Sequence, residues 1–524
     1  MIYDRLGKIA YTQFFSYDDI GRELEKRELK NKEGEYVGDF SSAKLLYRKT
    51  YDILPSQISL SSTNSLGKLT HLLLADGSGE FVYAYDSRGN IQEENAIINK
   101  KVISTHYEHD QLDRITNLIY PNNFKITYKY SDSDGKLSSI DNGIKNIDYD
   151  LLGGLKNINY ESDLQFSQVS DQASGLINKK MLVEANQERL LYQYSYDSTQ
   201  RITAINGVDP VMGEFQKNFQ YENVGQLTHA ACQSSRDQAG SQRSFAYTYD
   251  DSHNLLNPKL SDEKKDALGR VSQLSPSLSI VWGSDNLPLS VINTTESSKK
   301  QFIYFPDGNR FNEKVSKGID FNNYYFVNKY IDYDATNDKF TNYLWLDGKR
   351  IARSGDKADS KWNYFFLDHI NSSVFEFSKS DSLNISSLSN NYYLYSPYGI
   401  SLKVNENKEM NVDASGEGEA GLNQITTSFE RKHLFAGSLS DQEMPLFQMQ
   451  KRFYDPKRGR FLSPDPLFLE SPNRCIESPV ECNLYSYAGN NPINKIDCKH
   501  SIRNCWNGLG QQSIDLCCWL RKSW

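Results

Sequence analysis

The sequence predicts an all-β protein made of hairpins stacked side by side, and three observations support this prediction. The chain of 524 residues contains 34 Tyr and 25 Phe, side chains that suit the half-buried face of a strand. One turn signature recurs along most of the chain. Its copies are spaced by about the length of two strands with their turns, since Tyr85, Tyr107, Tyr130 and Tyr149 stand 22, 23 and 19 residues apart.

The repeated unit reads Tyr-Asp, two residues, Gly or a polar substitute, a polar residue and then an aliphatic residue. An Asp side chain can accept a hydrogen bond from the backbone two residues on and so start a turn, and Gly takes the positive φ that such a turn requires. Each copy therefore predicts a strand, a tight turn and a returning strand. Clear copies are "YDRLGKI" (3–9), "YAYDSRGNIQEE" (83–94), "YDLLGGLKNINY" (149–160) and "KDALGRVSQL" (265–274).

A single hairpin is marginal in water, so the copies must pair with one another. The period favours a β solenoid or wound sheet over helical repeats, whose hydrophobic pattern would follow 3.6 residues. A β-propeller is the first alternative, although its blades need about 40 to 45 residues. Unrelated small β domains are the second, although they would not share one turn signature.

Composition limits the classes of function. A net charge of −8 argues against nucleic acid as a partner, because phosphate binding needs a basic surface. The first residues lack the charged and apolar regions of a signal peptide, and no run approaches the about 20 apolar residues of a membrane span. Export would then need a dedicated machine or a longer parent chain. The histidines show no metal-ligand spacing and no phosphate-binding loop is present, so we expect neither metal nor cofactor.

Most of the cysteines gather at the end of the chain. Disulfides in an oxidising compartment and unpaired thiols in a divergent tail are both open interpretations. Metal binding is a third interpretation, although the cysteine spacing is not that of a zinc finger. Six of the seven are Cys475, Cys482, Cys498, Cys505, Cys517 and Cys518, and the other is Cys232.

The C-terminal third carries the most specific motifs. These are "NYFFLDHINSSVFEF" (363–377), with Asp368 and His369, then "YLYSPYGISL" (393–402), "HLFAGSLSDQEMPLFQMQKRFYDPKRGRFLSPDP" (433–466) and "NLYSYAGNNPINKID" (483–497). With the turn repeats, they resemble the YD-repeat or RHS (rearrangement hotspot) family and its repeat-associated core region. This type of chain is found in polymorphic toxins and in the C-subunits of insecticidal toxin complexes. Asn371 stands where the family commonly has glycine.

The resemblance implies one long spiralling antiparallel sheet of hairpins that forms a hollow or partial β-shell, with the core region curled inward as a plug. On this basis residues 1–403 are the repeat shell and residues 404–429 are a polar inserted loop. Residues 430–497 are the core region, and residues 498–524 are a cysteine-rich divergent tail. Prolines such as Pro456, Pro464 and Pro466 would stiffen the sharp turns of the plug.

The resemblance also implies a self-cleavage site of the aspartyl-protease type. Its catalytic residues would be Asp465 in "SPDPL" and Asp497 in "NKIDCKH", because two nearby carboxylates can divide acid and base roles toward a water. The cut would fall just beyond Asp497, near 500–502. This chain departs from the family pattern, with Cys-Lys-His at 498–500 in place of Pro-x-Gly and Pro464 where some relatives carry arginine. The alternative interpretation is that both aspartates only form turns.

These features predict a shell protein that encapsulates or delivers a toxic C-terminal segment, secreted or at the cell surface without a signal peptide. Any enzymatic activity would be intramolecular self-cleavage. The partners would be its own C-terminal segment, a partner shell or export-machine subunit, and a cell-surface glycan. A carbohydrate- or protein-binding module using exposed tyrosines is one alternative. An inactive fragment whose toxin domain is lost is another, because the 27 residues of the tail are too few for a folded domain.

Overall fold

A computed structural model describes most of the chain. The described residues are 2–3, 8–31, 38–54, 64–161, 164–210, 212–236, 242–256, 263–355, 361–378, 392–404, 410–411, 433–440, 446–466, 479–498 and 501–504.

The prediction of an all-β protein is confirmed. Within the described residues every regular element is a strand or a short 3₁₀ turn, and no α-helix is present. Accordingly, none of these elements is a helix that could cross a membrane. The strands form long antiparallel sheets in which each strand pairs with the next one along the chain. Pairing of this kind differs from the separate four-stranded blades of a propeller.

The chain forms two compact units, and the first consists of residues 1–141, 262–342 and 355–360. Its strands pair consecutively within two series. The first series comprises β1 (Ile2–Tyr3), β2 (Ile9–Tyr17), β3 (Glu23–Lys30), β4 (Lys44–Tyr51), β5 (Leu69–Leu74), β6 (Gly79–Tyr85), β7 (Ile91–Ile98), β8 (Lys101–His109), β9 (Ile115–Ile119), β10 (Lys125–Tyr130) and β11 (Leu137–Ile140). The second comprises β21 (Lys264–Lys265), β22 (Val271–Ser275), β23 (Leu278–Trp282), β24 (Pro288–Asn293), β25 (Ser298–Tyr304), β26 (Arg310–Lys317), β27 (Asp320–Asn328), β28 (Ile331–Asp334) and β29 (Lys339–Leu346), whose end reaches the second unit.

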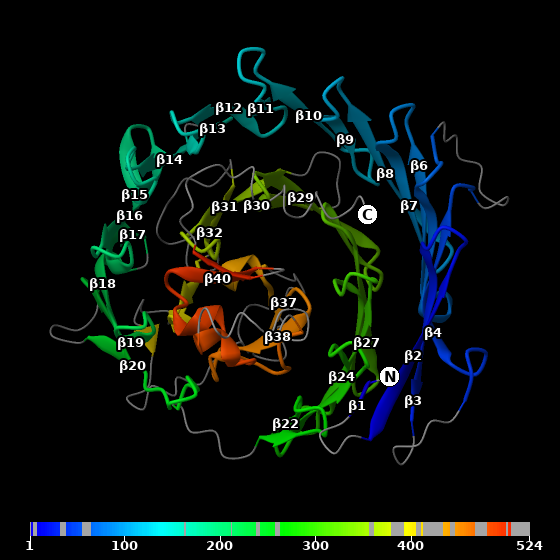
Figure 1. Cartoon of the computed structure of the whole chain (residues 1–524). Coiled ribbons are helices and arrows are strands. Elements are labelled where there is room, and N and C mark those ends of the chain that lie inside the picture. Colours follow the sequence, from blue (N-terminus) through cyan, green and yellow to red (C-terminus); the bar gives the residue numbers. More distant parts are fainter. Residues whose placement is uncertain are drawn as a thin grey trace. The chain divides into compact units, whose positions relative to one another are not determined.

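The second unit consists of residues 142–261, 343–354 and 361–524. Its repeat strands are β12 (Ile144–Tyr149), β13 (Leu155–Tyr160), β14 (Leu164–Ser170), β15 (Ile177–Glu184), β16 (Gln187–Tyr196), β17 (Ile202–Asp209), β18 (Gly213–Tyr221), β19 (Leu227–Ser234), β20 (Arg243–Ala246), β30 (Lys349–Ser354), β31 (Asn363–Leu367) and β32 (Ser373–Ser378). Shorter strands follow: β33 (Leu394–Tyr395), β34 (Ser401–Val404), β35 (Met410–Asn411), β36 (Leu439–Ser440), β37 (Phe447–Met449), β38 (Arg452–Asp455), β39 (Arg460–Phe461), β40 (Lys495–Cys498) and β41 (Ser501–Asn504). Within this unit β37, β38 and β40 lie on the inner side of the curve that β12–β20 follow (Figure 1).

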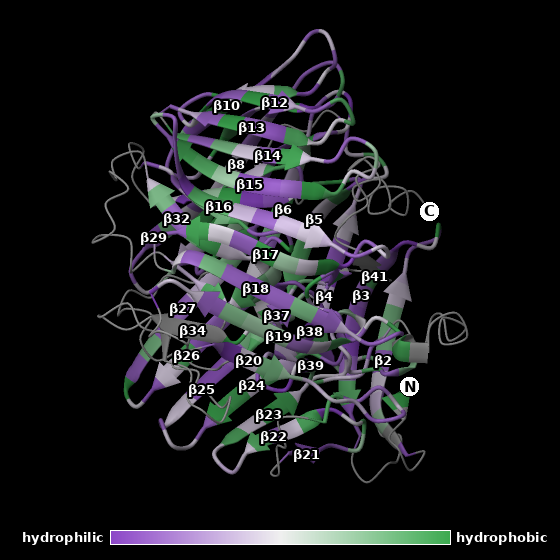
Figure 2. Cartoon of the chain, turned by 90° about the vertical axis from the view of Figure 1, so that its left-hand side faces the viewer, coloured by the Kyte–Doolittle hydropathy of each residue, from purple (hydrophilic) through white to green (hydrophobic). Residues whose placement is uncertain are grey.

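Burial alternates along the repeat strands, as expected for sheets with one face packed and one face solvated. In β5 every second residue is buried, and β16 alternates in the same way along its C-terminal half. Figure 2 shows hydrophobic and hydrophilic residues interspersed along β13–β18. One packed face of each sheet is therefore the main apolar core of the repeats.

The repeated aspartate makes the same turn in both units. Its Oδ1 accepts hydrogen bonds from the backbone N–H groups two and four residues later, which closes a compact loop between the strands. For Asp86 these donors are Arg88 and Asn90, both at 2.9 Å. The aspartates that share this pattern are Asp18, Asp86, Asp110, Asp150, Asp197, Asp250, Asp266 and Asp368.

The third residue after each aspartate has a positive φ, which confirms the predicted role of Gly or a polar substitute. Gly89 has φ 84°, a value at which residues with a Cβ are strained. Polar residues fill the same place in other copies at smaller angles, including Gln200 at 64° and His253 at 58°. Asn371, at 65°, occupies the position where the family resemblance leads one to expect glycine, and Asn tolerates this conformation better than most residues.

The repeat tyrosine is more than a strand former, because its hydroxyl joins neighbouring repeats. Tyr304, at the end of β25, donates a hydrogen bond to the carbonyl of Pro288, the first residue of β24, at 2.7 Å. The same bond reaches back by 15 to 22 residues from Tyr85, Tyr130, Tyr196, Tyr221, Tyr249 and Tyr395. Most of these tyrosines are therefore engaged inside the fold and are not free for stacking on sugars.

We expect Tyr304→Phe to destabilise the first unit by about 1 kcal/mol, the usual net value of one hydrogen bond. The matched control is Tyr17→Phe, because Tyr17 holds the same place in its repeat but is 57% exposed. The expected effect of the control substitution is near zero. Urea denaturation curves of both variants would measure the difference, and equal midpoints would show that the hydroxyl bond contributes nothing.

The predicted polar loop at 404–429 lies outside the described residues, except for Val404 at the end of β34 and for β35. Most of the predicted tail at 498–524 lies outside them too. The described part of the tail continues β40 and forms β41.

Candidate functional site

An aromatic cluster forms the base on which the candidate site stands. Tyr454 on β38 is fully buried, and its ring centroid lies 4.5 Å from that of Tyr487 and 5.7 Å from that of Phe461. Its hydroxyl donates to the carbonyl of Tyr398 at 2.7 Å. Phe435 stacks against the same ring at 6.3 Å. These contacts fix β38 and β39, and therefore also Arg452 at the start of β38.

Arg452 brings the two predicted catalytic aspartates together. Its Nη2 donates to Oδ2 of Asp497 at 2.9 Å and lies 3.3 Å from Oδ2 of Asp465. Its guanidinium carbon lies 3.6 Å from the centroid of the Phe461 ring, a distance at which the cation stacks on the ring face. The Arg452 and Asp497 side chains are each 10% exposed and that of Asp465 is 26% exposed. The site is thus shielded but reachable by water.

Different backbone elements position the two carboxylates. Asp465 follows β39, and its N–H donates to the carbonyl of Leu484 at 2.9 Å. Asp497 lies in β40, which pairs with β41 so that Asp497 stands opposite Ile502 and Cys498 opposite Ser501. The predicted cleavage region therefore folds back beside Asp497, although His500 lies outside the described residues.

Two neighbouring carboxylates suit acid–base chemistry, but this pair differs from a catalytic aspartic dyad in one respect. In an aspartic dyad the two carboxyl groups share a proton, whereas here they share the guanidinium of Arg452. The guanidinium holds both carboxylates in one place and offsets their mutual repulsion. For the pair to act on a water as acid and base, Arg452 must release at least one of them.

Sequence reasoning missed Arg452. The family resemblance leads one to expect an arginine at position 464, whereas the guanidinium beside the carboxylates comes from Arg452 on β38. The signal lay in the motif itself, since Arg452 opens the "RFYDP" stretch. Its separation of 45 residues from Asp497 hid the contact.

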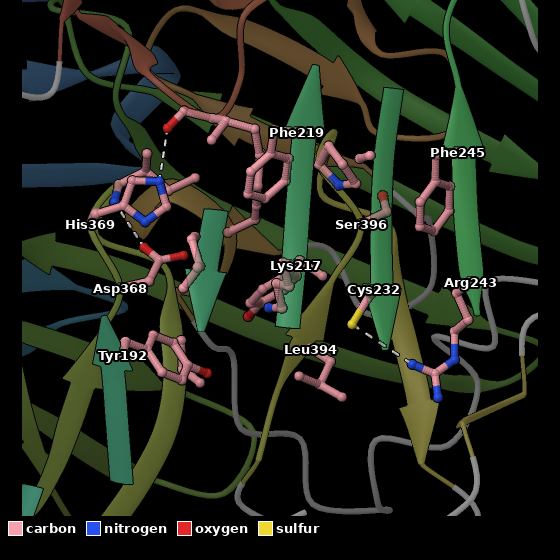
Figure 3. A pocket seen from close by; sticks show the side chains of 18 of the residues that line it. Tyr192, Lys217, Phe219, Cys232, Arg243, Phe245, Asp368, His369, Leu394 and Ser396 are labelled. Atoms are coloured by element: carbon pink, nitrogen blue, oxygen red, sulfur yellow. Dashed lines mark hydrogen bonds between the residues drawn. The ribbon is translucent and has the colours of Figure 1, made fainter. Parts of the chain in front are cut away.

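The predicted Asp-His segment does not join this site. Asp368 uses its Oδ1 for the N–H groups of Ile370 and Ser372 in a repeat-type turn. His369 donates from Nε2 to the carbonyl of Ile493 at 2.8 Å (Figure 3). Burial lowers the pKa of His369, which favours the neutral ring. Its role in the described structure is to attach β40 and the preceding turn to the repeat strands.

The structure describes only some of the seven cysteines. Cys482 is disulfide-bonded, whereas Cys232 on β19 is a thiol. Cys475, Cys505, Cys517 and Cys518 lie outside the described residues. The described residues contain no group of three His, Cys, Asp or Glu side chains placed to hold a metal ion.

Solved structures define the fold class of this chain. It has the fold of the toxin-complex chains in the crystal structure of TcdB2-TccC3-Cdc42, with a TM-score of 0.69 and 14% identity over 94% of this chain and 26% of that one. The Photorhabdus luminescens Tc holotoxin pore gives a TM-score of 0.69 and 14% identity over 93% of this chain and 26% of that one. At this level of identity the likeness concerns the fold alone.

Sequence comparison then gives particular relatives. The chain is 23% identical over 217 residues to the tRNA3(Ser)-specific nuclease WapA of Bacillus spizizenii, and 22% identical over 217 residues to the tRNA nuclease WapA of Bacillus subtilis strain 168. These matches cover 41% of this chain but only 8% of either relative. No model of a known protein family matches the chain.

Proposed function

We propose that this chain is a toxin-associated shell protein of the RHS type, which encloses its own C-terminal segment and cuts the chain just beyond Asp497. The fold of toxin-complex chains supports the shell role. Similarity to the WapA nucleases supports an association with toxins. Delivery to another cell, from the cell surface or by secretion through a partner shell or export-machine subunit, completes the proposal.

The observation that carries the cleavage step is the meeting of Asp465 and Asp497 at Arg452, with Ser501 and Ile502 beside Asp497. One carboxylate would take a proton from a water that attacks a carbonyl near 500–502. The other, protonated, would donate to the leaving nitrogen, so that one water is consumed and two chain ends form.

We expect the purified wild-type chain to lose its last residues in solution, and Asp465→Asn and Asp497→Asn to remain intact, because an amide can serve neither as the acid nor as the base. Intact mass spectrometry over time would measure the products and locate the cut. The matched control is Asp251→Asn, an exposed turn residue of the same unit, which should cleave like the wild type. An uncut wild-type chain, or cleavage that persists in both variants, would contradict the cleavage step.

Recognition of a glycan or protein surface remains the alternative. The burial of most repeat tyrosines leaves this role to exposed rings such as Phe15 and Tyr17, which stack at 6.5 Å and are 40% and 57% exposed. A glycan array probed with the purified chain would test it directly.

A further inference from the structure

The second unit contains a pocket that is separate from the aspartate site. The inner faces of β16–β20 form one wall, and the segments around Asp368 and Leu394, with Phe435 and Ile493, form the other (Figure 3). Pockets with mostly apolar walls and a few polar groups are the usual sites for small molecules. Neither Asp465 nor Asp497 lines it.

Most of the lining is apolar. Ile205 on β17, Phe219 on β18 and Val374 on β32 are buried, as is Leu394 on β33, and Phe245 on β20 closes one side. These side chains offer a surface to an aliphatic or aromatic body, and burial of such a body stabilises a complex by roughly 25 cal/mol per Å² of apolar surface.

Two cations stand in one row across the wall of the sheet. Lys217 pairs with Cys232 on the next strand, and Cys232 pairs with Arg243 on the strand after that. Directly paired residues share a face of the sheet, and all three line the pocket. Arg243 Nη1 lies 4.0 Å from the Cys232 sulfur. The row therefore presents an ammonium and a guanidinium on either side of a thiol.

Lys217 has no anionic partner among the described residues. Its ammonium lies 5.4 Å and 5.8 Å from the ring centroids of Phe215 and Tyr192, which gives cation–π contacts. Among the described residues that line the pocket the one carboxylate is Asp368, and it already accepts two backbone N–H groups. A half-buried ammonium without an anion is costly, so the pocket favours a ligand that supplies one.

We propose that this pocket binds a small carboxylate with an apolar body, in the class of medium-chain fatty acids. The carboxylate lies between Lys217 and Arg243, and the chain lies against Ile205, Phe219 and Leu394. This inference does not depend on self-cleavage, because the two sites share no residue.

Isothermal titration of the full chain with octanoate tests the proposal, with octanol and octylammonium as probes of the same length. We expect octanoate to bind at least about tenfold more tightly than octanol, the ratio that corresponds to about 1.4 kcal/mol, and octylammonium not to bind. Lys217→Met should remove this preference, whereas Lys217→Arg, which retains the charge, should preserve it.

The matched control is Lys179→Met, because Lys179 is another half-buried lysine, on β15, and does not line the pocket. This variant should bind octanoate like the wild type. Absence of octanoate binding, equal affinity for octanol, or an unchanged preference in Lys217→Met would each overturn the proposal. If Lys217→Met does not fold, the ligand comparison on the wild type and Lys217→Arg still decides the question.

Discussion

Replacing Glu94 by Gln is expected to make the first unit more stable at pH 8 and to remove most of its loss of stability between pH 5 and 7. Glu94 on β7 lies inside that unit, where Tyr107 on β8 donates to its Oε2 at 3.1 Å and Asn328 on β27 donates to the same atom at 3.0 Å. Burial raises the pKa of Glu94 to about 7, although the two hydrogen bonds and the charge of Lys329 act in the opposite direction.

The direction of the pH effect depends on whether the folded or the unfolded chain binds the proton of Glu94. Between the unfolded pKa of about 4.5 and the folded pKa of about 7, the folded chain retains a proton that the unfolded chain has lost. Stability therefore falls as the pH rises through this window and is constant above it. The full shift corresponds to an upper limit of roughly 3 kcal/mol, and the real value is smaller to the extent that water reaches this half-buried residue.

Hydrogen exchange of the β7 and β8 amides at pH 5, 6, 7 and 8 would measure this effect locally, which avoids the assumption that the whole chain unfolds in one step. In the Glu94→Gln variant the new side chain would still accept the bonds from Tyr107 and Asn328 through its amide oxygen. Glu108→Gln, which changes an exposed carboxylate on β8, is the matched control and should follow the wild type. Parallel pH dependences in wild type and Glu94→Gln would disprove the assignment.

The local chemistry of the repeats could be predicted because it is contained within a few residues. Asp86 and Gly89 form one turn from atoms at most four positions apart, so the sequence pattern and the geometry carry the same information. The bond from the tyrosine hydroxyl to the preceding repeat could not be predicted in this way. It joins strands whose register only the paired sheet defines, as from Tyr221 to Ile202.

The candidate site, too, could be predicted only in part from the sequence. Asp465 and Asp497 could be selected through the family resemblance, and the structure places both at one cation. Arg452 was missed because its contact depends on the path of the core region. The sequence did not indicate the environment of Glu94 either. In "IQEENAII" it looks like an exposed residue of an alternating strand, and the residue that donates to it, Asn328, is 234 positions away.

The core region is held to the repeat strands by a series of asparagine side chains, each directed at a repeat turn. Asn490 Nδ2 donates to the carbonyl of His253 at 2.8 Å, and Asn491 Nδ2 donates to that of Gly225 at 2.8 Å. Asn494 is buried, with 4% exposure, and lies at the next turn. Its Oδ1 accepts from the N–H of Ile202 at 2.7 Å, and its Nδ2 donates to the Tyr221 hydroxyl at 2.9 Å.

We expect Asn494→Ala to loosen the core region from the repeats at a cost of roughly 3 kcal/mol. The substitution leaves the buried N–H of Ile202 without its acceptor, and each orphaned buried group costs about 1 to 3 kcal/mol. Limited proteolysis should then release fragments of the core region at protease concentrations that leave the wild type intact. Asn483→Ala is the matched control, because Asn483 also bonds to the turn at His253, at 3.0 Å, but lies near the surface.

The same substitution tests whether the attachment of the core region and the aspartate site depend on each other. Asn494 is three residues before Asp497, and β40 begins at Lys495, so release of Asn494 frees the strand that carries the carboxylate to Arg452. If cleavage occurs in the wild type, it should be lost in Asn494→Ala even though both aspartates remain, and Asn483→Ala should retain it. Cleavage at the wild-type rate in a proteolytically loosened Asn494→Ala would show that the geometry at Arg452 does not require this attachment.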